Sequence, residues 1–172
     1  MIIKSYEVNK KDKVISSNNF YLLYGENVGL KKDIRDLIIN TKNEKAEYIT
    51  FYENDILSNE ENFYNSFYSG SLFSNKKIIT IHNCSDKITK HIEKISEKNL
   101  EDILLIIYSD ILPKKSKLRN FFEKSKKAIC IACYLDNDRD LQNIIIAELK
   151  KNNINLSREI INLVVEKSNN DR

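Results

Sequence analysis

The chain has 172 residues with 28 Lys and Arg against 25 Asp and Glu, so its formal net charge is only +3. This near balance is too small to indicate nucleic-acid binding by itself. Three Cys argue against a disulfide framework of the kind that small secreted proteins use. No apolar run approaches the roughly 18 to 20 residues of a membrane span, and the N-terminus lacks a signal-peptide pattern. We therefore expect a soluble, cytoplasmic protein without contact to a membrane.

The first half of the chain alternates strand-like and helical patterns. Residues 20–24 form an apolar run that predicts a strand, and residues 29–40 carry apolar side chains at helical spacing. A second strand is expected over 47–52. Ser58 and Glu61 then match a capping box, which predicts the start of the next helix.

The alternation continues in the second half. A third strand is expected over 77–82, followed by an amphipathic helix over about 88–95 and a fourth strand over 103–108. Pro113 is placed where a helix begins, and 128–134 forms the fifth strand. This order predicts an α/β fold of three layers, α-β-α, around a five-stranded, mostly parallel sheet.

After residue 134 the pattern becomes helical only. One helix is expected over about 138–151, and another begins near Ser157. Both have apolar faces, yet no third helix follows to cover them. We therefore divide the chain into an α/β domain, 1–136, and the start of a truncated helical domain, 137–172.

The turn after the first strand has the setting of a phosphate-binding loop, because it joins a strand to a helix. Leu30 stands where such a loop needs a glycine, Lys32 replaces the hydroxyl that binds Mg²⁺, and Glu26 adds a negative charge. A simple strand-to-helix turn is therefore favoured, and we expect a degenerate loop with no bound cofactor. The remaining loop residues are Gly25, Gly29 and Lys31.

The patterns that suggest a metal site are weak. Cys130 and Cys133 have the C-x-x-C spacing, but residues three apart in a strand point to opposite faces. Buried structural cysteines are the favoured interpretation. His82 and Cys84 have no matching ligands elsewhere, and strand 77–82 ends without the Asp or Glu that would hold Mg²⁺ in an NTPase. We assign no metal.

A basic segment follows the fourth strand and could face DNA. Its positive residues are Lys114, Lys115, Lys117, Arg119, Lys124, Lys126 and Lys127. They alternate at helical spacing with the apolar residues Leu118, Phe121 and Phe122, which is also the pattern of a solvated outer helix face. We favour the solvated face over a DNA-binding one.

An apolar pair, Leu72 and Phe73, stands just before the third strand. Small residues, Gly70 and Ser71, precede it, and polar residues follow. Composition alone favours a pair that is tucked into the core. If exposed, such a pair would be an anchor for the hydrophobic pocket of a partner.

Four stretches together resemble the family of δ subunits of the bacterial DNA polymerase III clamp loader. They are residues 20–27, 71–77, 104–118 and 169–172. The resemblance implies an AAA+-like domain without ATPase function, a helical lid and a C-terminal collar domain, the last absent from this chain. It also implies a protein that is not an enzyme by itself, because other loader subunits handle ATP.

By this resemblance, the chain binds the sliding clamp, the β subunit, and helps to open its ring for loading onto primed DNA. Leu72 and Phe73 would be the plug that enters the clamp, with Gly70 and Ser71 beside them. Other loader subunits would be contacted through the missing C-terminal domain, and any contact with DNA would be indirect.

Two alternatives stay open. A divergent nucleotide-binding ATPase would use Lys31, and a DNA-binding module would use residues 114–127.

Overall fold

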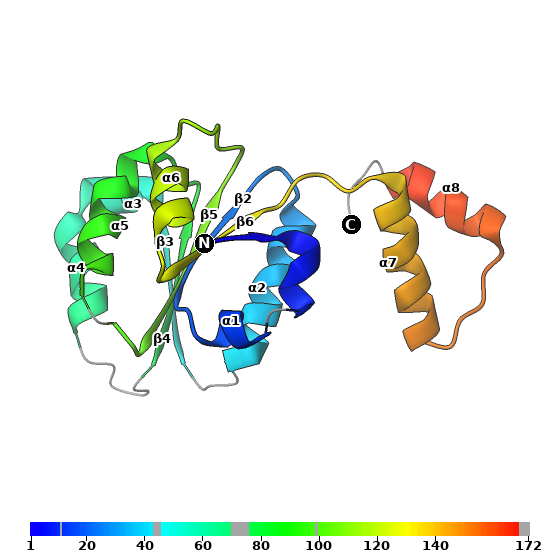
Figure 1. Ribbon diagram of the computed structural model, residues 1–172, viewed down its shortest axis with the longest axis horizontal. Coiled ribbons are helices and arrows are strands. Elements are labelled where there is room, and N and C mark those ends of the chain that lie inside the picture. Colours follow the sequence, from blue (N-terminus) through cyan, green and yellow to red (C-terminus); the bar gives the residue numbers. More distant parts are fainter. Residues whose placement is uncertain (11, 43–45, 70–75, 99, 169–172) are drawn as a thin grey trace.

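The computed structural model describes residues 1–10, 12–42, 46–69, 76–98 and 100–168 (Figure 1). A six-stranded sheet in the order β1-β6-β2-β5-β4-β3 forms its centre, and each pair of neighbouring strands is parallel. The strands are β1 (Ile2–Lys4), β2 (Phe20–Tyr24), β3 (Glu47–Tyr52), β4 (Lys77–His82), β5 (Ile103–Ser109) and β6 (Ala128–Ala132).

Helices cover both faces of this sheet. Figure 1 shows α3 to α6 on one face and η1, α1 and α2 on the other, while α7 and α8 follow β6 beyond the sheet. The helices are η1 (Ser5–Lys10), α1 (Asp12–Ser16), α2 (Val28–Lys42), α3 (Glu53–Ser58), α4 (Glu60–Tyr68), η2 (Asp86–Ile88), α5 (Thr89–Ser96), α6 (Lys117–Lys124), α7 (Asp138–Lys151) and α8 (Arg158–Ser168). The expected three-layer α/β architecture is confirmed.

The central strands are apolar on both faces because each face supports its own core. Along β2, Phe20, Leu22 and Tyr24 enter the core beneath α3 to α6. Tyr21 and Leu23 enter the core beneath η1, α1 and α2. Successive side chains of a strand alternate between faces, so a run of five buried residues is what a doubly covered parallel strand requires.

The expected number of five strands is wrong, because β1 adds a sixth at the edge of the sheet. Ile3 of β1 aligns with Ile131 of β6, and the N–H of Cys130 donates to the carbonyl of Met1 at 2.8 Å. A strand of three residues is too short to show a periodic pattern in the sequence. Only its pairing with β6 identifies it as a strand.

Two expected helix starts are also wrong. Asn59, not Ser58, caps α4, and its side-chain oxygen accepts the N–H of Asn62 at 3.0 Å. Ser58 is instead the last residue of α3. Pro113 precedes α6 without starting it, because Ser116 provides the cap of that helix.

The last two helices have the expected positions, and they contact each other. Leu141 of α7 is buried, as are Ile161 and Val165 of α8. Other apolar residues of this pair stay exposed, among them Leu163 and Val164. The division of the chain at residue 136 stays a prediction. Within the described ranges, no helix is both long and apolar enough to cross a bilayer.

Candidate functional site

The turn between β2 and α2 lies at the carboxyl edge of the sheet, where a phosphate-binding loop would be placed. Gly25 directly follows β2 and has a φ of 129°, and a Cβ there would lie 2.1 Å from the carbonyl oxygen of Cys133. A side chain at this position would meet both backbone strain and a steric clash. The turn therefore needs glycine in order to approach β6, and this requirement is independent of any phosphate.

Several N–H groups of this turn donate to acceptors within the protein. Gly25 donates to the carbonyl of Ser109 at 3.2 Å, and Asn27 donates to that of Cys133 at 3.1 Å. The N–H of Leu30, at the start of α2, donates to the side-chain oxygen of Asn27 at 2.8 Å. A phosphate loop needs such N–H groups to point at the anion, whereas here they close the turn onto β5 and β6.

Lys31 occupies the position of a phosphate-loop lysine but is directed into the protein. Its Nζ donates to the carbonyl of Gly25 at 2.7 Å and to that of Ser109 at 3.1 Å. The side chain is only 7% exposed. Of the three loop residues expected from the sequence, the structure thus brings Gly25 and Lys31 together, while Gly29 lies in the first turn of α2.

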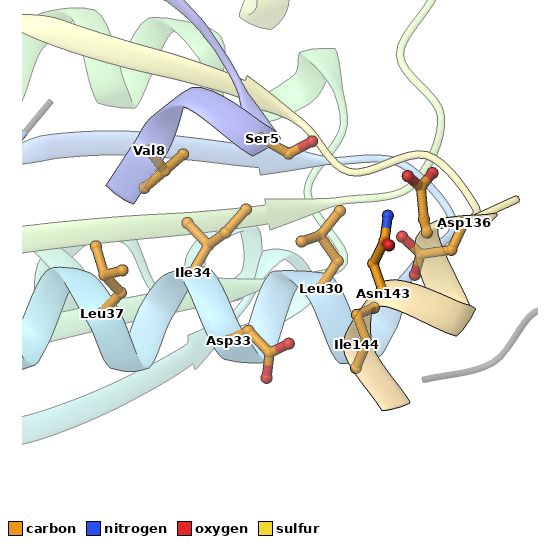
Figure 2. Close-up of a pocket in the computed structure, with 10 residues that line it drawn as sticks. Ser5, Val8, Leu30, Asp33, Ile34, Leu37, Asp136, Asn143 and Ile144 are labelled. Carbon is orange, nitrogen blue, oxygen red and sulfur yellow. The ribbon is translucent and has the colours of Figure 1, made fainter. Parts of the chain in front are cut away.

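Beside this turn lies a cleft of about 460 Å³ between η1, α2 and the start of α7 (Figure 2). In this view Ile34 of α2 points toward Val8 of η1, and Leu30 lies on the side of Ser5. The described lining residues carry three carboxylates and neither Lys nor Arg: Ser5, Val8, Leu30, Asp33, Ile34, Leu37, Asp136, Asp140, Asn143 and Ile144. This negative lining opposes the binding of a phosphate anion.

Asp136 joins the cleft to the turn. Its carboxylate accepts a hydrogen bond from the side-chain amide of Asn27 at 2.7 Å, and the residue is 8% exposed. Asn27 therefore holds Leu30 through its oxygen and Asp136 through its nitrogen. The side chain of Asn27 thus fixes the connection to α7 against the start of α2.

The end of β4 carries an imidazole where an NTPase would place a carboxylate. His82 stacks on Tyr108 of β5, with 4.4 Å between the ring centroids and 14° between the planes. Burial lowers the pKa of His82, and the positive charges of Arg35 and Lys31 lower it further. Burial also raises the pKa of Tyr108 to about 12. Both rings are therefore neutral near pH 7.

The cysteines behave as buried structural residues. Cys130 belongs to the core beneath α3 to α6 and Cys133 to the opposite core, which confirms that the pair diverges. Burial raises the pKa of Cys130 to about 12 and also raises that of Cys84. Such thiols are unreactive. In the part of the chain that the structure describes, no three His, Cys, Asp or Glu side chains gather as a metal site.

Two acidic residues that sequence reasoning missed fix the loop after β4. Glu53, at the start of α3, accepts the N–H and the hydroxyl of Ser85 at 2.6 and 2.9 Å. Asp86 accepts the hydroxyl of Ser116 at 2.6 Å and the N–H of Leu118 at 3.0 Å. Burial alone would raise the pKa of Asp86, but these hydrogen bonds lower it overall. Both contacts join distant parts of the chain, so no local pattern signals them.

The positive side chains of the basic segment lie in different surroundings. Arg119 turns inward: its Nε is 2.7 Å from Glu123 and its guanidinium lies 4.9 Å from the ring centre of Tyr24. Lys117 and Lys124 instead border a groove of about 1040 Å³ between α5 and α6. We call this the basic groove, and its lining residues are Asp86, Lys87, Thr89, Lys90, Glu93, Lys117, Asn120, Phe121, Lys124 and Ser125.

Gly70, Ser71, Leu72 and Phe73 lie outside the described residues. The residues on either side of them are described. Ser69 caps the end of α4, and β4 begins at Lys77. In a parallel sheet the start of a strand lies at the amino edge, which is opposite to the turn at Gly25.

Comparisons with known proteins agree with this architecture. The model of the family "DNA polymerase III, delta subunit" matches residues 21–136. A probable DNA polymerase III subunit delta of Rickettsia prowazekii is 26% identical over 145 residues, which are 81% of this chain and 42% of that protein. The chain thus spans less than half of the length of this relative.

Solved structures share the fold at low sequence identity. The Bacillus subtilis DNA clamp loader delta protein has a TM-score of 0.63 and 14% identity, and the match covers 94% of this chain and 51% of that one. Domain III of the Thermotoga maritima replication initiation protein DnaA has a TM-score of 0.52 and 14% identity, with coverage of 97% and 76%.

The DnaA likeness agrees with the AAA+-like fold, and the family model covers the sheet from Tyr21 in β2 to the end of β6, with β1 outside the match. The chain therefore belongs to the DNA polymerase III delta subunit family.

Proposed function

We propose that this chain is the clamp-binding portion of a clamp-loader delta subunit. In this proposal it binds the sliding clamp and helps to open the ring for loading onto primed DNA. Leu72 and Phe73 insert into a hydrophobic pocket of the clamp, with Gly70 and Ser71 beside them. Membership of the family supports this role, as does the position of Ser69 and Lys77 at the edge opposite to the closed turn.

The observation that carries the proposal is the closed turn after β2. The N–H groups of Gly25, Asn27 and Leu30 and the ammonium of Lys31 donate to protein oxygens. The neighbouring cleft is acidic. An ATPase needs these donors for phosphate. We infer that the chain acts without a cofactor and is not an enzyme by itself, and that ATP is handled by other loader subunits. Those subunits would meet the portion of the relatives that this chain does not span.

The anchor pair would supply part of the binding energy, and the surrounding helix ends and loops would supply the rest. Burying Leu72 and Phe73 would contribute roughly 1.5–3 kcal/mol each. Anchors of this kind dominate protein interfaces. A protein that opens the clamp must also bind the open ring more tightly than the closed ring, because equal affinity for both would leave the equilibrium between them unchanged.

Replacing the anchor pair tests this role. We expect Leu72→Ala/Phe73→Ala to weaken binding of the cognate sliding clamp by about 100-fold or more, since two buried side chains are lost. Surface plasmon resonance with immobilised clamp measures the affinity. The matched control is Ile111→Ala/Leu135→Ala, which also removes two large side chains, 59% and 56% exposed. Undiminished affinity in the anchor variant would contradict the site assignment.

Calorimetry with Mg-ATP tests the closed turn. We expect no saturable heat for the unmodified chain at millimolar nucleotide, because the ammonium of Lys31 and the N–H groups of Gly25, Asn27 and Leu30 already have protein acceptors. Lys31→Ala is measured alongside. Nucleotide binding that disappears in Lys31→Ala would instead support the divergent ATPase.

A second candidate function is direct contact with duplex DNA through the basic groove. The observation in its favour is that four lysines border one groove that also holds two carboxylates, Asp86 and Glu93. The lysines are Lys87, Lys90, Lys117 and Lys124. Lysines arranged in this way can neutralise phosphates without reading the sequence.

The salt dependence of duplex binding tests the basic groove. We expect Lys117→Gln/Lys124→Gln to weaken binding and to reduce the slope of log K against log salt by about 1 for each lost phosphate contact. Lys126→Gln/Lys127→Gln is the control, because these exposed residues lie in the same segment but do not line the groove. Equal slopes in both variants and in the unmodified chain would exclude the groove as the DNA contact.

A further inference from the structure

Lys77 is a buried cation that connects the end of α4 to the start of β4. The residue is 6% exposed. Its Nζ donates to the carbonyl of Ser66 at 2.7 Å and to the carbonyl of Ser69 at 2.6 Å. The hydroxyl of Ser69 lies 3.3 Å from the same nitrogen. One ammonium thus contacts three oxygens at the end of α4.

These contacts provide hydrogen-bond partners both for the carbonyls at the end of α4 and for the buried ammonium of Lys77. The last carbonyls of a helix have no partner within the helix and form the negative end of its dipole. A buried ammonium, in turn, needs acceptors for its three N–H groups. Ser66 belongs to the last turn of α4, and Ser69 is its C-terminal cap. Lys77 therefore fixes where α4 ends.

The backbone of Lys77 is itself held by the sheet. Its N–H donates to the carbonyl of Asp102 at 2.9 Å, and the residue pairs in register with Glu47 of β3 and Ile103 of β5. The N–H of Glu47 also donates to the carbonyl of Lys76 at 3.0 Å. The amino edge of the sheet thus provides a fixed base for the ammonium.

Helix α4 is also held along its length by α5 and the residues after it. The hydroxyl of Tyr64 and Nδ1 of His91 are hydrogen-bonded at 2.9 Å. Lys94 lies 4.3 Å from the ring centre of Tyr64, and Lys98 lies 4.3 Å from that of Tyr68. These contacts pack α4 against α5, while Lys77 connects the C-terminal end of α4 to β4.

We propose that Lys77 is a positioning residue for clamp binding, because its ammonium ties together Ser69 and β4, the two ends between which Leu72 and Phe73 lie in the sequence. This inference rests on the proposed function, in which that pair is the anchor. A segment whose ends are held together loses less conformational freedom on binding, and affinity rises accordingly. Lys77 acts on the clamp through the anchor pair and does not itself contact the clamp.

The chain offers a closely matched control in Lys31. Both lysines are more than nine-tenths buried, and both donate to neutral backbone carbonyls. Lys31 lies at the carboxyl edge of the sheet and Lys77 at the amino edge. Methionine at either position keeps most of the apolar stem and removes the ammonium.

The test is a double-mutant cycle on binding to the cognate sliding clamp, at a temperature where circular dichroism shows every variant folded. We expect Lys77→Met to weaken binding about tenfold, and Lys31→Met to leave it unchanged. In a Leu72→Ala background, Lys77→Met should have a much smaller effect, because it acts through the anchor. A merely structural lysine would lower the melting temperature without this coupling.

The remaining outcomes separate the two proposals. If Leu72→Ala weakens binding but Lys77→Met does not, or if their effects simply add, the positioning role is wrong and the anchor stands. If Leu72→Ala binds as the unmodified chain does, both are wrong. Should Lys77→Met fail to fold, Lys77→Gln, which keeps two N–H donors, takes its place under the same criteria.

Discussion

The fold depends on how the turn after β2 is closed. Lys31 joins the carbonyl of Gly25, directly after β2, to that of Ser109, at the end of the neighbouring strand β5. The absence of a Cβ at Gly25 lets the same turn approach Cys133 after β6. The three central strands are thereby tied together at their carboxyl ends. The lysine ammonium that would bind phosphate in an NTPase here stabilises the sheet.

With this turn closed, the two edges of the sheet differ in the kind of contact that they make. At the carboxyl edge, polar contacts such as those of Asn27, Glu53 and Asp86 are directed inward. At the amino edge, Lys77 holds the end of α4 against β4. In the proposed function, the first edge maintains the scaffold and the second presents the anchor for a protein partner. A buried lysine is costly unless its donors are satisfied, and both edges meet that condition with backbone carbonyls.

Sequence patterns predicted most of the fold because doubly covered parallel strands are runs of apolar residues, as in β2 and β5. These patterns failed where contacts between distant or neighbouring elements determine the structure. Strand β1 is defined by its pairing with β6, and α4 is capped by Asn59 and not by the expected Ser58. For the candidate site, the residue types at 25–32 predicted a degenerate loop, but not that Lys31 turns inward. The role of Lys77 was likewise not predictable, because it depends on contacts with a helix end 8 and 11 residues away. The assignment of Leu72 and Phe73 stays a prediction.

Hydrogen–deuterium exchange of the chain with and without the sliding clamp tests the central claim most directly. It reports where the clamp covers the backbone without any substitution. We predict that protection on clamp binding concentrates in residues 69–77 and leaves the turn at 25–31 unchanged. Protection confined to that turn or to the basic groove, with none in 69–77, would contradict the proposed clamp-binding role.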